Sequence, residues 1–300
     1  MKLKFETGLN RTQPDPFMCE VEGGWAMYVT AFDGVEAYAS DSPFGTWEYK
    51  GVVCKVEHAW RYWAPCIIHI GEWYYLYFSC TKEGRFEYLH VAKSRNPFGP
   101  FEGAHCMYEH FTIDAHVVQT KAGLFLWYAQ NNPEDKEHPG TRVYVERLLD
   151  PCTPDGHPRE VIVPTMPEEK SGENWYTIEG AFWLEHKGYQ YVMYSGGSFM
   201  DDTYHIGYSS AKSDEQDLPK VDFIKHTKDG AFDPVLIKNE EEEGTGHHSV
   251  VSYEGQYYAV YHGRDISENV GRMELDNEKR TARICKLFFE NGKIRAERIE

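Results

Sequence analysis

The sequence predicts an all-β chain that forms a single five-bladed β-propeller with four-stranded blades, and three observations lead to this prediction. Five short aromatic runs recur along the 300 residues, starting at positions 25, 73, 124, 189 and 257. Each run follows a glycine by one or two positions and is rich in aromatic and β-branched residues, as expected where a hairpin turn leads into a buried strand. No stretch has the hydrophobic period of an amphipathic helix.

The spacing of the runs indicates the number of blades. Successive starts are separated by 48, 51, 65 and 68 residues, which suits blade repeats of roughly 40–50 residues that carry loop insertions. Five units fall within the range of about 4–8 blades that propellers have. A further strand is expected after each run, at 35–40, 88–92, 142–146, 205–209 and 283–289. Because no linker interrupts the repeat, residues 1–300 are predicted to be one domain.

Composition and charge limit the class of partner. A hydrophobic content of 41% is ample for a large core, and the formal charge of −17 argues against nucleic acid or an anionic membrane as a partner. No apolar segment approaches the ~18 residues of a membrane span, and the amino terminus lacks the apolar core of a secretory signal. Seven cysteines without a Cys-x-x-Cys pair indicate reduced thiols, so a cytoplasmic location is expected. Nothing in the sequence indicates an oligomeric state.

One position of the repeat carries polar or aromatic side chains that suggest a functional site. Ten residues upstream of the runs stand Asp15, Trp63, Asp114, Glu179 and His247. In a propeller the innermost strand of each blade lines the axis, so residues at the same phase of successive blades surround one opening. The shared position is therefore predicted to form one central site.

Three carboxylates in one opening would repel one another, and burying them is costly. Their repulsion raises at least one pKa, so one carboxyl can act as a general acid while another acts as a general base. Inverting glycoside hydrolysis requires such a pair, ~6.5–9.5 Å apart. The alternative for any single aspartate is a turn residue or a helix cap. Three acids at one repeat phase favour the functional interpretation.

Five short motifs occur in order at blade spacing and resemble family 43 of the glycoside hydrolases. They are Gln13-Pro14-Asp15-Pro16, Trp63-Ala64-Pro65, Ile113-Asp114-Ala115-His116, Ile178-Glu179-Gly180 and Gly244-Thr245-Gly246-His247-His248-Ser249. The resemblance implies a five-bladed propeller that cleaves arabinofuranosides or xylosides with inversion and needs no cofactor for the chemistry. It implies that Asp15 is the general base, that Glu179 is the general acid, and that Asp114 positions the acid and raises its pKa.

His247 has two interpretations. A lone histidine among glycines is often structural, whereas the resemblance implies that His247 reaches the axis and helps to hold a structural calcium ion through water. Calcium prefers ~6–8 oxygen ligands, so an imidazole would be a poor direct ligand. Zinc is not expected, because the sequence has neither a His-Glu-x-x-His motif nor paired cysteines.

Four residues near the shared position are predicted to contact the sugar. Trp63 and Trp60 are candidates for stacking on a sugar ring, with core packing as the alternative. Phe32 follows the first run and is a candidate for lining the pocket, with a plain loop role as the alternative. Ile113 is a candidate for contacting the sugar because it directly precedes Asp114.

Three arginines near the carboxyl terminus are also candidates for sugar binding. Arg264 could bond sugar hydroxyls or pair with its neighbour Asp265. Arg280 and Arg283 lie in a segment that resembles the part of the family's last blade that carries an inward arginine. The sequence leaves open which of the two points inward.

The predicted function is an inverting exo-glycosidase that releases terminal α-L-arabinofuranosyl units from arabino-oligosaccharides. Many xylosidases of the family append a β-sandwich, and none is expected after this propeller, so arabinofuranosides are favoured. β-Xylosidase and endo-arabinanase activity remain alternatives. The loops at 131–139, 165–174 and 239–244 are candidates for the wall that an exo enzyme needs. A carbohydrate-binding propeller without hydrolysis is an alternative of another class, although it would gain nothing from three desolvated carboxylates.

Overall fold

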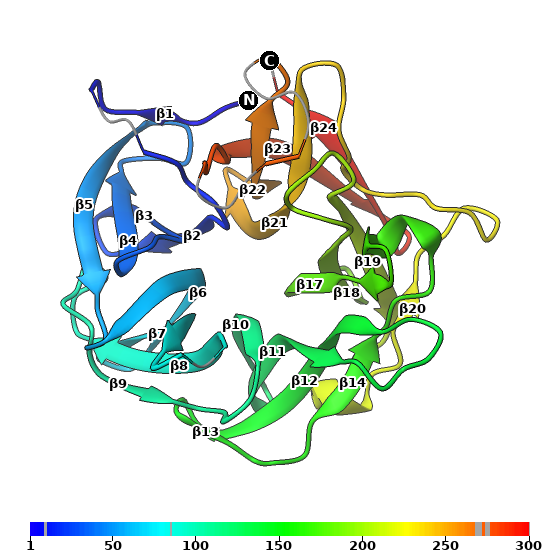
Figure 1. Ribbon diagram of the computed structural model, residues 1–300, viewed down its shortest axis with the longest axis horizontal. Helices are drawn as coiled ribbons and strands as arrows, with labels where there is room; N and C mark the ends of the chain where they lie inside the picture. The colour runs from blue at the N-terminus through cyan, green and yellow to red at the C-terminus, as the bar shows by residue number, and fades with distance from the viewer. Residues whose placement is uncertain (9–10, 85, 268–271, 274–276, 300) are drawn as a thin grey trace.

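A computed structural model describes residues 1–8, 11–84, 86–267, 272–273 and 277–299. The described chain is all-β, with two single-turn 3₁₀ helices at Pro167–Glu169 and Leu218–Lys220. Figure 1 shows the strands arranged as sheets around a centre, so the predicted all-β class and a propeller-like arrangement are confirmed. Among the described residues, no helix is long and apolar enough to cross a membrane.

The strands form five sheets, which follow one another along the chain. The first contains β1 (Lys4–Phe5), β2 (Phe17–Val21), β3 (Gly24–Val29), β4 (Val35–Ser40) and β5 (Thr46–Cys54). The second contains β6 (Ala59–Ile70), β7 (Trp73–Lys82), β8 (Tyr88–Ser94) and β9 (Glu102–Cys106). The third contains β10 (Thr112–Thr120), β11 (Gly123–Asn132), β12 (Gly140–Asp150), β13 (Thr153–Pro154), β14 (Arg159–Ile162), β15 (Lys170–Gly172) and β16 (Trp175–Tyr176).

The last two sheets have four strands each. One contains β17 (Ile178–His186), β18 (Tyr189–Gly196), β19 (His205–Lys212) and β20 (Ile224–Lys225). The other contains β21 (Glu242–Tyr253), β22 (Gln256–Asp265), β23 (Thr281–Glu290) and β24 (Lys293–Arg298). The five aromatic runs lie in β3, β7, β11, β18 and β22, and the strands expected after them lie in β4, β8, β12, β19 and β23.

The prediction of four strands in every blade is wrong for two sheets. In the first sheet, β1 pairs in parallel with the outer strand β5, while residues 1–3 pair with β23 of the last sheet. In the third sheet, the 150–176 insertion folds back and adds short strands beside β12. These additions pair the outer backbone groups of each sheet, which would otherwise be exposed. The number of five blades stays a prediction.

The inner edge of each sheet is formed by its first complete strand. β2 contacts β6, β6 contacts β10, β10 contacts β17, β17 contacts β21, and β21 contacts β2. The hydrophobic core is accordingly divided into five clusters, each between two neighbouring sheets. Aromatic side chains such as Trp47 and Trp127 fill these interfaces and are fully buried. Residues of the inner strands that lie far apart in sequence therefore meet at one centre.

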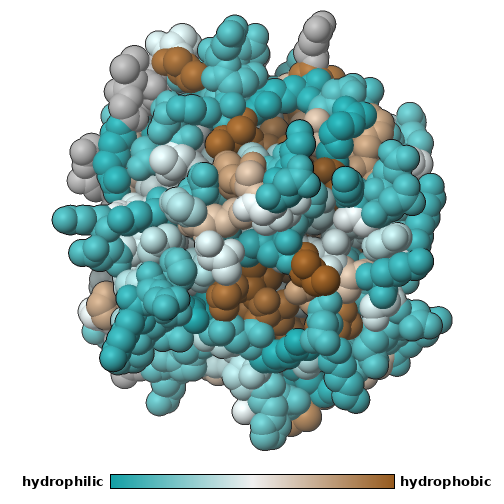
Figure 2. Space-filling model, turned by 90° about the vertical axis from the view of Figure 1, so that its right-hand side faces the viewer, coloured by the Kyte–Doolittle hydropathy of each residue, from teal (hydrophilic) through white to brown (hydrophobic). Residues whose placement is uncertain are grey.

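The surface of the molecule is mostly hydrophilic on the face shown in Figure 2. On the face shown in Figure 2, hydrophilic side chains cover most of the molecule and hydrophobic ones gather in small groups between them. This distribution is expected when alternate residues of outer strands face water.

Candidate active site

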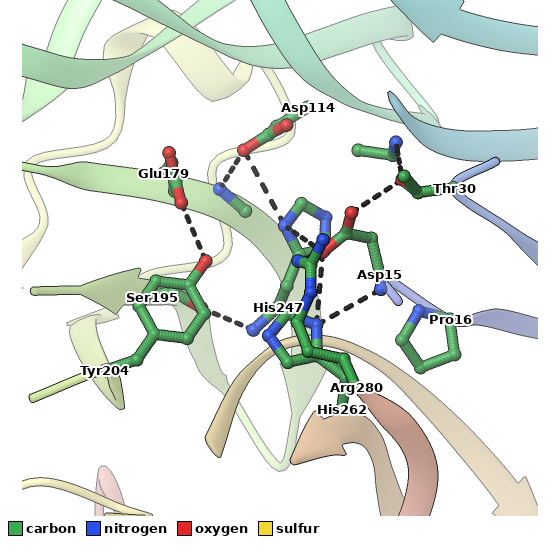
Figure 3. Close-up of polar contacts among 12 residues, drawn as sticks. Asp15, Pro16, Thr30, Asp114, Glu179, Ser195, Tyr204, His247, His262 and Arg280 are labelled. Carbon is green, nitrogen blue, oxygen red and sulfur yellow. Dashed lines mark hydrogen bonds and ion pairs between the residues drawn. The ribbon is translucent and has the colours of Figure 1, made fainter. Parts of the chain in front are cut away.

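A cavity of about 630 Å³ opens where the inner strands converge, and the shared position of all five sheets contributes to its lining. Asp15 lies just before β2, Trp63 on β6, Asp114 on β10, Glu179 on β17 and His247 on β21. Figure 3 shows the three acids around His247, with Arg280 in front. Three carboxyl groups that lie up to 164 positions apart in the sequence thus line one pocket.

The backbone bends at this position in every inner strand. Asp15, Asp114 and His247 have positive φ angles of 52°, 62° and 44°. Glu179 and Trp63 each lie one residue before such a bend, at Gly180 (φ 60°) and Ala64 (φ 44°).

The four strand pairings that include β6, β10, β17 and β21 also lose their register here. Such bulges re-aim side chains and are common beside active sites. Left-handed backbone at residues other than glycine costs free energy, and it is typical of sites where geometry serves function.

Asp15 is held by partners on both oxygens. Its Oδ1 accepts a hydrogen bond from Arg280 Nη1 at 3.0 Å, and its Oδ2 accepts one from the Thr30 hydroxyl at 2.6 Å. Burial alone would raise the pKa of Asp15, but the guanidinium of Arg280 and the nearby His247 hold it well below its ordinary value. Asp15 is therefore ionised over the neutral range, as a general base must be.

The other two acids have pKa values that are shifted in the opposite direction. Burial raises the pKa of Glu179 to about 7, and the charge of Asp15 adds to this shift. Burial, then the charges of Glu179 and Asp15, raise the pKa of Asp114 well above its ordinary value. Asp114 Oδ2 accepts the backbone N–H of Gly180 at 3.0 Å. The pocket therefore contains one ionised carboxylate and two carboxyls that retain protons at higher pH, an arrangement suited to acid–base catalysis.

The family model for glycosyl hydrolases family 43 matches residues 9–294. The chain belongs to this family. The alignment with Alpha-L-arabinofuranosidase B of Pyricularia oryzae is 26% identical over 241 residues and covers 76% of this chain and 48% of that protein. With the Extracellular exo-alpha-(1->5)-L-arabinofuranosidase of Streptomyces avermitilis it is 28% identical over 183 residues and covers 60% and 36%. The chain thus spans about half the length, or less, of these relatives.

Solved structures share the fold of this family 43 chain. A thermostable family-43 glycoside hydrolase superimposes with a TM-score of 0.81 at 24% identity, covering 95% of this chain and 92% of that one. The alpha-L-arabinofuranosidase from Lactobacillus brevis superimposes with a TM-score of 0.77 at 18% identity, covering 96% and 94%. At these identities the comparison speaks for the fold alone.

Four of the predicted sugar-contacting residues line the pocket of this family 43 member. Trp63, Phe32 and Ile113 form apolar parts of its wall. Phe32 is 63% exposed, so its ring is available to a ligand at the mouth. Arg280 is the inward arginine of the pair that the sequence left open, since it bonds Asp15 and also packs over the ring of Phe199 at 4.7 Å.

The other three predicted contacts lie outside the pocket lining that the structure describes. Trp60 lies on β6 opposite Thr81, before the bend that turns Trp63 inward. Arg264 is fully buried and pairs with Glu243 at 3.0 Å, not with Asp265. Arg283 pairs with Glu242 at 3.0 Å and bonds Asp265. Buried arginines of this kind need carboxylate partners, so the two side chains support the last sheet.

The three loops expected to wall the pocket also lie elsewhere. Among the described residues, none from 131–139, 165–174 or 239–244 lines the cavity. The 165–174 segment instead carries β15, which pairs with β16 beside the third sheet. The wall comes from residues at 11–14, 30–36 and 199–204 and from Asn277 and Glu278.

His247 lies between the carboxylates, and its surroundings do not fit direct calcium ligation. Its Nδ1 is 3.6 Å from Asp15 Oδ1 and 3.7 Å from Asp114 Oδ2, and burial lowers its pKa, so the ring is neutral near pH 7. The described residues contain no group of three or more His, Cys, Asp or Glu side chains arranged to hold a metal ion. Calcium takes ~6–8 oxygen ligands. A calcium ion held through water stays a prediction, and no chemistry is derived from it.

Several residues of the site were missed by reasoning from the sequence. Thr30 bonds the general-base candidate, Glu278 pairs with Arg280 at 2.7 Å, and Tyr204 donates a hydrogen bond to Glu179 at 2.7 Å. His262 Nδ1 accepts the backbone N–H of Asp15 at 3.1 Å. None of them occupies the shared position of the repeat. His262 lies two residues before Arg264, one of the predicted sugar contacts.

Proposed function

We propose that this chain is an inverting exo-glycosidase that releases terminal α-L-arabinofuranosyl units from arabino-oligosaccharides. The observation that carries the proposal is the opposite shift of two carboxyl pKa values in one pocket, lowered at Asp15 and raised to about 7 at Glu179. A pair of this kind supplies the base and the acid that inversion requires. The names of the relatives support arabinofuranosides as the substrate class.

In the proposed mechanism Asp15 removes a proton from the attacking water. Thr30 and Arg280 each bond one oxygen of Asp15, so the carboxylate has a fixed orientation. Each carboxylate oxygen has two acceptor sites, so a water can still bond to it. Arg280 keeps Asp15 ionised before the reaction and is itself balanced by Glu278.

Glu179 donates its proton to the leaving oxygen in this mechanism. Asp114 accepts the N–H of Gly180, the residue after the acid, and so fixes the backbone that carries Glu179. Repulsion between the two carboxyls is mutual, so whichever of Asp114 and Glu179 ionises first raises the pKa of the other. All five sheets act as blades in this proposal, since each contributes one residue of the shared position to the pocket.

The pocket walls support attack at a chain end. On the side of the first sheet, Arg11 pairs with Glu36 at 2.5 Å beside the exposed Phe32. On the other side, Phe199 and Glu278 pack against Arg280. Walls on both sides favour an exo enzyme, whereas an endo-arabinanase needs an open groove.

Hydrolysis of a small substrate panel tests the proposed function. The panel contains 4-nitrophenyl α-L-arabinofuranoside, 4-nitrophenyl β-D-xylopyranoside, linear arabino-oligosaccharides and debranched arabinan. We expect release from the arabinofuranoside, and single arabinose units from the oligosaccharides. Preference for the xyloside would favour a β-xylosidase, and oligomers released from arabinan would favour an endo-arabinanase. Binding of arabino-oligosaccharides without any hydrolysis would favour a binding propeller.

The pH profile of kcat/KM is predicted to fall on its basic side through about pH 7. Burial raises the pKa of Glu179 to about 7, and a general acid works only while protonated, so activity is lost as pH rises through that value. The pKa of Asp15 lies well below its ordinary value, so loss on the acid side requires a much lower pH. Initial rates across pH 3–10, with stability checked at each pH, measure both limbs. A profile that stays level to pH 9 would contradict the acid assigned here.

Asp114→Asn is predicted to move the basic limb to lower pH and to lower kcat/KM by roughly 10- to 100-fold, the equivalent of about 1.4–2.7 kcal/mol. The substitution leaves a neutral group at position 114, so an ionised carboxylate can no longer form there and raise the pKa of Glu179, but it keeps a carbonyl oxygen for the Gly180 N–H. Asp114→Ala loses both effects and should be slower still. If the limb of the asparagine variant stays in place, Asp114 does not tune the acid.

A further inference from the structure

Tyr204, directly before β19, donates a hydrogen bond from its hydroxyl to Glu179 Oε1 at 2.7 Å (Figure 3). The side chain is fully buried yet lines the pocket beside the acid. Burial raises the pKa of Tyr204 well above its ordinary value, and the carboxylates of Glu179, Asp114 and Asp15 add to this shift. The phenol therefore keeps its proton and remains a donor throughout the working range of pH.

The ring of Tyr204 is fixed on two faces. It stacks on His262, with the ring centroids 5.5 Å apart and the planes 5° from parallel, and Phe199 packs edge-on at 6.5 Å. Gly246 on β21 leaves room for it, since a Cβ atom there would lie 2.2 Å from Tyr204 Cε1. A ring confined in this way holds its hydroxyl at one point, so the hydrogen bond to Glu179 costs little ordering.

The stack also joins the acid to the base. Since His262 Nδ1 accepts the backbone N–H of Asp15 at 3.1 Å, this nitrogen carries no proton. Burial lowers the pKa of His262 to about 4, so its ring is neutral and its contact with Asp15 Oδ1 is not an ion pair. A chain of contacts thus runs from Glu179 through Tyr204 and His262 to Asp15.

This geometry has a consequence for the proton on Glu179. Because Oε1 accepts the tyrosine hydroxyl, the carboxyl proton belongs on Oε2. As Glu179 gives up that proton, the bond from Tyr204 becomes charge-assisted and strengthens. The contact therefore stabilises the carboxylate that forms in the transition state more than the acid in the ground state.

We propose that Tyr204 is a positioning residue for the general acid, which holds Oε1 of Glu179 so that Oε2 presents the proton to the leaving oxygen, and which links the acid to the base through His262. The inference rests on the proposed function, because it requires Glu179 to be the proton donor. It adds a tyrosine to the acid–base machinery that the shared position of the repeat does not contain.

Tyr204→Phe tests the proposal, because it keeps the ring and removes only the hydroxyl. The basic limb of the pH profile should move to higher pH, since a donor that favours ionised Glu179 is lost. Turnover of phenyl and alkyl arabinofuranosides should fall about 10- to 100-fold, the loss expected for one charge-assisted hydrogen bond. The 2,4-dinitrophenyl substrate, whose leaving group needs no proton, should lose much less.

Tyr261→Phe is the matched control. Tyr261 is also fully buried and donates to a carboxylate, Glu242 Oε1 at 2.9 Å, but it does not line the pocket. We expect this variant to lose stability without any movement of the limb. Gly246→Ala displaces the ring of Tyr204 from behind and should move the limb in the same direction as Tyr204→Phe.

Glu179→Ala, measured in the same series, distinguishes failure of the proposed function from failure of the positioning role. If Glu179→Ala loses activity equally on all leaving groups, the acid assignment fails and the role of Tyr204 fails with it. If the activity loss in Glu179→Ala depends on the leaving group, the proposed function stands. If the basic limb of Tyr204→Phe then lies at the same pH as that of Tyr261→Phe, the positioning role is overturned.

Discussion

Asp15→Ala is expected to lower kcat/KM by roughly 10²–10⁴-fold, the contribution typical of a general base. The substitution removes the only proposed acceptor for the proton of the attacking water. Arg280 keeps its second partner, Glu278 at 2.7 Å, so its charge is not left unpaired. The variant should therefore fold, and its melting temperature and kinetics can be compared with those of the parent enzyme.

Asp265→Ala provides the matched control for this loss. Asp265 accepts hydrogen bonds from Lys2 and Arg283 but does not line the pocket. A carboxylate–arginine contact is thus broken in both variants, but Asp15→Ala removes the proposed base and Asp265→Ala keeps it. Similar activity losses in the two would indicate that Asp15 matters for structure alone.

Glu179→Ala is expected to show the second large effect, and the effect should depend on the leaving group. With phenyl and alkyl arabinofuranosides, kcat/KM should fall by about 10²–10⁴-fold, because the departing oxygen needs a proton. With 2,4-dinitrophenyl arabinofuranoside the loss should stay within roughly tenfold. The basic limb of the parent profile, near pH 7, should disappear with the carboxyl that produces it.

Glu146→Ala is the control for Glu179, since Glu146 also accepts a tyrosine hydroxyl, from Tyr108 at 2.7 Å, outside the pocket. It should lower stability and leave the dependence on leaving group unchanged. A plot of log kcat/KM against leaving-group pKa compares the three proteins. An equal slope for the parent and Glu179→Ala would rule out Glu179 as the proton donor.

The repeat made much of this site predictable from sequence. The aromatic runs mark the strand second from the inner edge of each sheet, and a fixed offset from them finds a residue on, or just before, each inner strand. This offset identified Asp15, Asp114, Glu179, Trp63 and His247, all of which line the cavity. The offset identifies these positions because strand order and turn chemistry are local features that repeat from sheet to sheet.

Features that depend on tertiary contacts could not be predicted in the same way. Tyr204 reaches Glu179 from a loop before β19, and its position depends on the stack with His262 and on the space at Gly246. Arg264 and Arg283 look like equal candidates to Arg280 until their partners, Glu243 and Glu242, are known. The left-handed bends that aim the acids occur at aspartate as well as glycine, and aspartate does not by itself mark such a bend.

The anomeric form of the sugar first released tests the central claim most directly. Proton NMR of α-L-arabinofuranoside hydrolysis, recorded faster than mutarotation, identifies this form. If Asp15 activates a water that attacks the sugar face opposite to the oxygen protonated by Glu179, the β-anomer of arabinose appears first. Initial release of the α-anomer would show retention of configuration and contradict the mechanism proposed for these carboxyls.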